Sequence, residues 1–188
     1  MQDEIASNYD ADINQMTLGH KWLVDNFGLE HAPRVAWHID PQGHVGATAA
    51  RFAAMGFDAF VPNRVPNPVK AKLLQTKQLE FVWDGMATEM PASRQAGSRI
   101  FTHVLDAYGY NPPNSPRNLY FFDDYTYWKG ERNMTEEPPI NATSVAVFVK
   151  RMQGFMLQRA AWLATPNMLF PWGSDFECPR PPGAVKRP

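Results

Sequence analysis

Apolar positions along the first part of the chain change from a helical to a strand-like period. From Asp10 to Phe27 they recur every three or four residues, which predicts an amphipathic helix that ends at Gly28. The stripe of this helix consists of Ile13, Met16, His20, Leu23 and Phe27. Residues Arg34–Ile39 then alternate, which predicts a strand that ends at Asp40 and Pro41. The larger apolar side chains of this strand share one side and are Val35, Trp37 and Ile39.

The next segment predicts a strand–helix–strand unit. An alanine-rich helix is expected over Ala47–Met55, closed by Gly56, and a second apolar strand over Phe57–Val61. Two strands joined by a crossover helix normally run parallel. The unit therefore predicts a parallel sheet with helices outside it.

The remainder of the chain continues the same order of elements. Helices are predicted over Lys70–Thr76 and Thr143–Leu163. Strands are predicted over Gln78–Trp83, Ile100–Leu105 and Met168–Trp172. Prolines and glycines mark surface loops over residues 106–118 and 130–139. This recurrence predicts an α/β fold that is part of a barrel or of an open parallel sheet.

Composition fits a single globular domain. The chain has 188 residues, of which 44% are hydrophobic, and no repeat or change of composition marks a second domain. We place the domain at residues 1–178 and regard residues 179–188 as an irregular, proline-rich tail. Cys178 is the only cysteine, which excludes an internal disulfide and a zinc site of the CxxC type.

Charge and hydropathy limit the partners. Eighteen basic and nineteen acidic residues leave a net charge of -1, which provides no electrostatic footprint for nucleic acid or an anionic membrane. No apolar run reaches the roughly 18 to 20 residues of a membrane span, and Met1 opens into a polar stretch without a signal-peptide pattern. The expected partner is therefore a neutral molecule.

Two acidic residues stand in matching places. Asp40 follows the strand that ends at Ile39, and Asp175 follows the strand that ends near Trp172. In a parallel α/β architecture both emerge at the carboxyl end of the sheet, where catalytic residues are usually found. Glycoside hydrolysis needs two such carboxylates, one beside the sugar cation and one that protonates the leaving oxygen. The alternative is that each acid merely caps the helix after its strand.

Histidines near Asp40 extend the candidate chemistry. His38 and His44 flank it in the string Trp-His-Ile-Asp-Pro-Gln-Gly-His, residues 37–44. Carboxylate and imidazole both suit zinc, but three ligands on one strand end rarely point at one ion, so at most one or two are expected to bind. His44 either orients Asp40 through a hydrogen bond or sits in the turn. For His38, His20 and His103 we favour a structural role.

The string at residues 37–44 resembles the WxIDPFGHS signature of class II α-mannosidases, glycoside hydrolase family 38. Five further blocks are similar to that family's blocks and follow its order. They are Gln15–Leu23, Phe52–Asp58, Leu79–Trp83, Phe101–Val104 and Gly173–Phe176. The resemblance extends to about Cys178, and five ordered blocks are more specific than any single one.

The resemblance implies a (β/α)7 barrel-like catalytic domain that removes terminal α-linked mannose from the oligosaccharides of N-linked glycans, with retention of configuration. It implies that Asp40 is both the nucleophile and a ligand of one Zn2+, and that Asp175 is the acid/base. Arg64 and Tyr110 resemble positions that contact the bound sugar or the nucleophile. By residue type alone, Arg64 is a surface cation and Tyr110 a loop aromatic.

The same resemblance implies that the chain holds part of such a domain. The family's HxD zinc block is expected before Asp10 and its last zinc-binding histidine beyond Pro188, which leaves Asp40 as the one expected ligand. Within the signature, Gln42 replaces Phe and Val45 replaces Ser. We therefore expect a domain that is incomplete at both ends and inactive alone, with the rest of the mannosidase chain as its partner.

The sequence also bears on the location of the protein and on two alternative functions. The Gly-Ser-Asp-Phe block at residues 173–176 resembles the lysosomal branch of the family, and this resemblance together with sequons at Asn133 and Asn141 favours the lysosome or another lumen of the secretory pathway. A metal-dependent carbohydrate deacetylase is the rival enzyme, because it also places acids and histidines at strand ends. A sugar-binding remnant without turnover is the non-enzymatic alternative.

Overall fold

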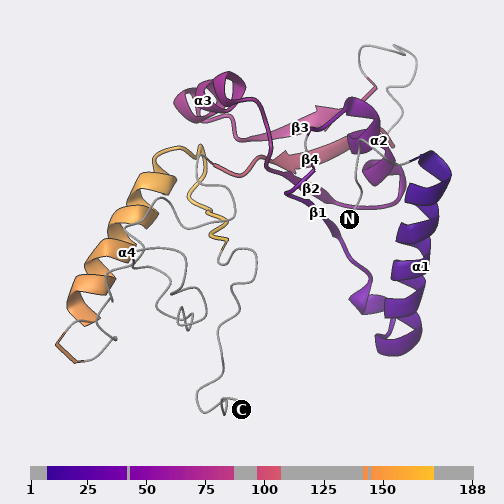
Figure 1. Cartoon of the computed structure of the whole chain (residues 1–188), viewed down its shortest axis with the longest axis horizontal. Helices are drawn as coiled ribbons and strands as arrows, with labels where there is room; N and C mark the ends of the chain where they lie inside the picture. The colour runs from indigo at the N-terminus through magenta and orange to yellow at the C-terminus, as the bar shows by residue number, and fades with distance from the viewer. Residues whose placement is uncertain (1–7, 42, 87–96, 107–141, 144, 172–188) are drawn as a thin grey trace, which may run out of the picture. The chain divides into compact units, whose positions relative to one another are not determined.

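The computed structural model describes residues 8–41, 43–86, 97–106, 142–143 and 145–171 (Figure 1). Contacts divide the chain into two compact units, Met1–Ala107 with Trp162–Ala164, and Tyr108–Ala161 with Thr165–Pro188. The first unit holds the sheet and the helices α1 to α3, and the second holds α4. The predicted loop over 106–118 lies outside the described residues except for Asp106, and the predicted loop over 130–139 and the tail over 179–188 lie wholly outside them.

Helix α1 spans Tyr9–Phe27 and confirms the first predicted element. The side chain of Asn8 caps its start, because Oδ1 accepts a hydrogen bond from the main-chain N–H of Ala11 at 2.8 Å. Gly28 ends the helix with φ of 103°, in a region that favours glycine. A short 3-10 turn, η1, follows over Leu29–His31.

The buried side of α1 differs from its predicted stripe at both ends. Its central residues Met16, His20 and Leu23 are half-buried, but Ile13 and Phe27 are exposed. The most buried side chain of the helix is Asp12, whose Oδ2 lies 3.3 Å from Nη1 of Arg51 in the next helix. An ion pair therefore occupies a place for which hydrophobic periodicity predicts no contact.

The predicted strand–helix–strand unit is confirmed. Strand β1 spans Val35–His38, helix α2 spans Gly46–Ala54, and strand β2 spans Ala59–Pro62. β1 and β2 pair in parallel, with His38 opposite Pro62 at their carboxyl ends. Strand β4, Arg99–His103, pairs in parallel with the other side of β2.

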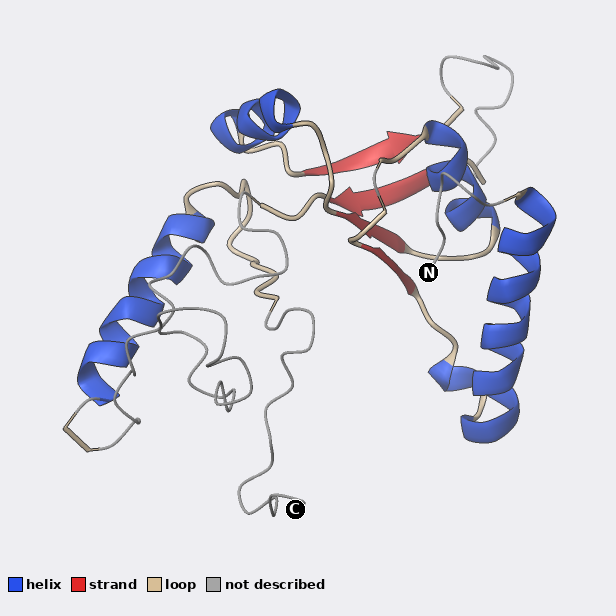
Figure 2. Cartoon of the chain, in the orientation of Figure 1, coloured by secondary structure: helices blue, strands red, loops and turns tan. Residues whose placement is uncertain are grey.

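The fourth strand makes the sheet mixed. β3 spans Glu80–Asp84 and runs antiparallel to β4, as the opposed arrows in Figure 2 show. The strand order is β1-β2-β4-β3, so the described strands form an open sheet and not a closed barrel. The expectation of a wholly parallel sheet is wrong at this edge. Residues 85–98 between the two strands contain Pro91 and two glycines, which favour turns over the crossover helix that parallel pairing requires.

Helix α3 spans Asn67–Thr76 and begins three residues earlier than predicted. In the second unit, α4 spans Val145–Ala160, inside its predicted range. The predicted strand near its end is absent, since residues 168–171 have no regular structure. The Phe170 ring instead lies 4.7 Å from the guanidinium of the buried Arg159, and Pro171 has no N–H for a strand ladder.

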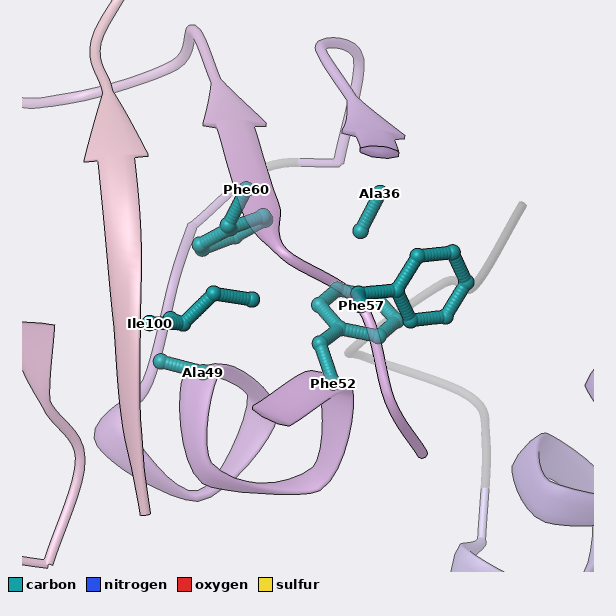
Figure 3. Packing of buried hydrophobic residues seen from close by; sticks show 6 residues of the cluster. All are labelled: Ala36, Ala49, Phe52, Phe57, Phe60 and Ile100. Atoms are coloured by element: carbon teal, nitrogen blue, oxygen red, sulfur yellow. The ribbon is translucent and has the colours of Figure 1, made fainter. Parts of the chain in front are cut away.

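One face of the sheet is covered by α2. Figure 3 shows Ala49 and Phe52 of this helix directed toward Phe60 of β2 and Ile100 of β4. The ring centres of Phe52 and Phe60 are 5.2 Å apart, within the range of favourable aromatic contact. Ala36 of β1 completes this side of the core.

The opposite face of the sheet carries large apolar side chains that stay about half exposed. They are Val35, Trp37, Val82 and Phe101, at 44% to 54% of full exposure. The strand registers align Val35, Phe101 and Val82 across the sheet, because Val35 pairs with Ala59, Ala59 with Phe101, and Phe101 with Val82. On β1 the buried residues are thus Ala36 and His38, and not the larger apolar residues that mark its predicted side.

The start of α2 touches the end of β3 through two glycines. A Cβ on Gly85 would lie 2.1 Å from the main-chain oxygen of Gly46, and a Cβ on Gly46 would lie 2.4 Å from that of Gly85. Main-chain atoms cannot rotate away as a side chain can. Helix and sheet therefore approach as closely as they do only because neither position has a side chain.

We expect Gly85→Ala to lower the free energy of unfolding by roughly 1 to 3 kcal/mol, because it forces α2 away from the sheet. Urea unfolding followed by tryptophan fluorescence measures this change. Gly19→Ala in α1 is the matched control, because a Cβ there meets no atom within 4 Å. It should raise stability by up to about 1 kcal/mol through helix propensity. Equal effects of both substitutions would contradict the proposed contact.

Candidate active site

The site forms where the parallel strands end. β1, β2 and β4 point in the same direction, so the residues that follow them share one edge of the sheet. Asp40 follows β1, and Arg64 follows β2 at the matching position. The parallel register therefore brings these two predicted site residues together.

Asp40 and Arg64 form an ion pair. Both Nε, at 3.1 Å, and Nη2 of Arg64 donate hydrogen bonds to Oδ1 of Asp40. Both of these hydrogen bonds end on the same carboxylate oxygen. The two side chains are about half exposed, so their pairing contributes only about 0 to 1 kcal/mol to stability.

A second ion pair spans the same two strands at their other ends. Arg34 precedes β1 and donates through Nε to Asp58, which precedes β2. The partners in each pair are 24 residues apart in sequence. The amino-edge pair is more exposed, at 79% for Arg34 and 55% for Asp58, and it serves as an internal reference for an ion pair away from the candidate site.

Lys70 connects the ends of β2 and β4. It is the fourth residue of α3, and its Nζ donates to Oδ1 of Asn63 at 3.0 Å and to the main-chain oxygen of Asp106 at 3.3 Å. Burial lowers the pKa of Lys70, and the carboxylate of Asp106 opposes that shift. The ammonium group is thus part of the interior of this edge and not a solvated surface charge.

His44 lies inside the same region. Its ring centre is 5.4 Å from that of His38 and 5.8 Å from that of Phe60. Both ring nitrogens are buried, with no hydrogen-bond partner among the described residues, so His44 does not orient Asp40 through a hydrogen bond. The pKa of His44 is lowered from 6.5 to about 4, first by burial, then by positive charge on His38 and on Lys70.

The other histidines occupy structural positions. His38 is 1% exposed and its ring contacts those of Phe52 and Phe60. His20 of α1 packs edge-on against Phe57. His103 of β4 pairs across the strands with Glu80, Nδ1 to Oε1, at 3.0 Å.

The remaining predicted site residues, Asp175 and Tyr110, lie outside the described residues. Within the described ranges no group of three or more His, Cys, Asp or Glu side chains is arranged to hold a metal ion. Sequence reasoning missed Asn63 and Lys70. One signal was available, because a lysine near the positive start of a predicted helix is unfavourable unless it has another partner.

The fold and site define an α/β domain that presents a carboxylate, held by a guanidinium, at the carboxyl edge of parallel strands. This is the architecture in which many hydrolases place their acids. Residues 1–185 match the glycosyl hydrolases family 38 N-terminal domain, and the chain belongs to this family.

Curated relatives agree with this assignment. The chain is 32% identical over 189 residues to the epididymis-specific alpha-mannosidase of Homo sapiens, covering 93% of this chain and 17% of the relative. It is 34% identical to the lysosomal alpha-mannosidases of Dictyostelium discoideum and Homo sapiens, covering 94% of this chain and 16% of each relative. The chain thus spans about a sixth of the length of these relatives. Among the described helices, none is long and apolar enough to cross a membrane.

The lowered pKa of His44 predicts a specific dependence of stability on pH. Between about pH 6.5 and pH 4 the unfolded chain binds a proton on this residue that the folded chain excludes. The contribution of neutral His44 to the free energy of unfolding is therefore complete above pH 6.5 and is lost as the pH falls toward 4. We expect His44→Phe to flatten this part of the curve of unfolding free energy against pH, measured by urea titration.

His31→Phe is the control, because His31 lies on the surface beside Glu30. It should leave the slope between pH 4 and 6.5 unchanged. An identical slope in the wild-type chain and in His44→Phe would show that His44 is not excluded from protonation.

Proposed function

We propose that the protein containing this chain hydrolyses terminal α-D-mannose residues of N-linked glycans with retention of configuration, in glycoprotein catabolism. The observation that carries the proposal is the Asp40 carboxylate, held by Arg64 at the carboxyl edge of the sheet in a family 38 domain. The relatives' names supply the substrate class, since all three are alpha-mannosidases.

Asp40 is the proposed nucleophile. Its carboxylate attacks the anomeric carbon as the bond from that carbon to the leaving oxygen breaks, and Asp175 gives its proton to that oxygen. Asp175 then takes a proton from water, the water oxygen bonds to the anomeric carbon, and the bond to Asp40 breaks. Arg64 is proposed to keep the Asp40 carboxylate oriented between these steps, because its guanidinium donates two hydrogen bonds to Oδ1. Tyr110 is proposed to contact the sugar.

Asp40 is also the proposed ligand of a catalytic Zn2+. A carboxylate oxygen is a suitable donor for zinc, and both hydrogen bonds from Arg64 end on Oδ1 alone. Because the described residues contain no three-donor cluster, the remaining ligands are proposed to come from elsewhere in the protein. When bound, the ion supplies Lewis-acid stabilisation for the sugar hydroxyls.

The sheet is proposed to be part of a (β/α)7 barrel formed with the rest of the protein. In such a barrel helices cover the outside and strand side chains fill the inside. Helix α2 covers one face, and the uncovered face carries Trp37 and Phe101. Further strands would bury that apolar surface. The domain boundary at residue 178 belongs to the same proposal.

The proposed location is the lysosome or another lumen of the secretory pathway. Two of the relatives described above are named as lysosomal. The sequons at Asn133 and Asn141 are compatible with such a lumen. Mass spectrometry of both sites in protein from the natural source tests this location, because their glycans are added only in the secretory pathway.

The test of function uses the complete reading frame around the codons for Met1 to Pro188. We expect the purified product to hydrolyse an aryl α-mannoside, to lose activity with a chelator and to regain it with Zn2+. Asp40→Asn should reduce kcat at least about a thousandfold, because no nucleophile remains. A fluorinated mannosyl inhibitor should add its sugar mass to the peptide that contains Asp40.

Asp58→Asn is the matched control, because it removes a carboxylate from the equivalent ion pair at the amino edge and should leave kcat unchanged. Release of acetate from acetylated sugars, without labelling of Asp40, would establish a deacetylase instead. Mannose binding without turnover would establish a sugar-binding remnant. Either result overturns the proposal.

The isolated 188-residue chain is proposed to be inactive and poorly soluble, because its sheet exposes an apolar face. We expect Trp37→Gln combined with Phe101→Thr to raise the soluble fraction after expression several-fold. Leu29→Gln is the control, since Leu29 is 76% exposed but lies on η1 and not on the sheet. A soluble wild-type chain that melts cooperatively and hydrolyses an aryl α-mannoside would contradict both parts.

A further inference from the structure

Lys70 prolongs the contact between β2 and β4 beyond their last main-chain hydrogen bond. That bond runs from the N–H of Leu105 to the oxygen of Pro62, at 3.0 Å. The next residue of each segment is then bound by the same ammonium group, through the side chain of Asn63 and the main-chain oxygen of Asp106. A side chain from α3 therefore closes the end of the sheet at the candidate site.

The charge of Lys70 is not explained by its place in helix α3. Lys70 lies near the amino end of the helix, where the helix dipole disfavours positive charge. Its side chain is partly buried, and ordering a long side chain costs conformational entropy. Both hydrogen bonds of the Lys70 ammonium group go to the segments that follow β2 and β4. These partners, and not helix α3 itself, explain why a lysine stands at this position.

Arg64 directly follows one of those partners. Asn63 is bound by Lys70, and Arg64 reaches from the same short segment to Asp40 after β1. The segment is short and turned, since the N–H of Val65 donates to the oxygen of Asn63 at 2.8 Å. Movement of Asn63 therefore moves the point from which Arg64 extends.

We propose that Lys70 is a positioning residue for Asp40: by binding Asn63 and Asp106 it fixes the end of β2 from which Arg64 holds the carboxylate. The inference rests on the proposed function, in which Asp40 is the nucleophile. These contacts of Lys70 lie at the carboxyl edge of the sheet, where the chemistry is proposed.

The Arg64 guanidinium reports on this arrangement directly. In the 188-residue chain made soluble by Trp37→Gln and Phe101→Thr, the background for every variant below, and labelled with 15N-arginine, the Nε–H signal of Arg64 is assigned by its shift in Asp40→Asn. We expect Lys70→Met to raise the solvent-exchange rate of this proton at least about tenfold, because local opening becomes easier when the hydrogen bonds to Lys70 are lost. Lys70→Arg, which keeps donors at this position, should restore part of the protection.

Two controls separate positioning from stability. Lys72→Met removes an exposed lysine from the same helix and should leave the Arg64 signal unchanged. The Nε–H of Arg34 should be unaffected in every variant, whereas a general loss of stability would raise its exchange as well. Should Lys70→Met fail to fold, Asn63→Ala removes one of the two acceptors and should raise Arg64 exchange in the same direction.

Three results would overturn the inference. The first is an unchanged exchange rate of the Arg64 Nε–H in a folded Lys70→Met chain, or in Asn63→Ala if Lys70→Met does not fold. The second is an equal change of that rate in Lys72→Met. The third is an Arg64 signal that does not respond to Asp40→Asn. In the full-length protein, kcat for an aryl α-mannoside should fall about ten- to a hundredfold in Lys70→Met, with a smaller change in KM. If the wild-type protein has no such activity, the proposed function fails, while the exchange measurement still decides whether Lys70 positions Arg64.

Discussion

The packing of α2 against the sheet is the contact on which the rest of the first unit depends. Phe52 places its ring 5.5 Å from that of Phe57, 5.2 Å from that of Phe60 and 5.7 Å from that of His38. This one side chain therefore ties the helix to both strands that it connects. Since the same helix links β1 to β2, its packing on the sheet also determines the relative positions of the segments that follow the two strands.

The candidate site combines an exposed, energetically weak pair with a more buried support. Asp40 and Arg64 are about half exposed to solvent, and their pairing adds little to stability. Lys70 and His44 lie behind them in partly buried positions, where a changed charge or a lost partner is costly. The sheet edge thus combines an exposed ion pair with partly buried titratable groups.

Local pattern in the sequence was sufficient for the helices and for the parallel unit. The period of α1, the alanines of α2 and the alternation of β1 each reflect interactions within a few residues, and they were predicted correctly. The direction of β3 was not predicted correctly, because strand direction depends on pairing between segments, which composition does not encode. The side of β1 that α2 covers was not predicted either, since a strand that is apolar on both faces carries no signal for which face a helix covers.

The candidate site was predictable in part for the same reason. Asp40 stands in a recognisable motif, and the parallel register then brings Arg64 opposite to it. Asn63 and Lys70 belong to no motif, and their contact depends on how the turn after β2 folds back onto α3. The burial of His44 depends on the Phe60 ring and on His38, and a hydrogen bond to Asp40 was an equally reasonable prediction from sequence.

The Asp12–Arg51 pair has a consequence for how the family can vary. The aspartate side chain is 3% exposed and the arginine 17%, so the two charges neutralise each other away from water. Loss of either alone leaves a buried charge without compensation, which typically costs about 3 to 5 kcal/mol, whereas replacing both with apolar residues is often neutral. Asp12 and Arg51 are therefore expected to be replaced together and not one at a time. Homologous sequences should show correlated change at these two positions, a statistical trace of the contact between α1 and α2.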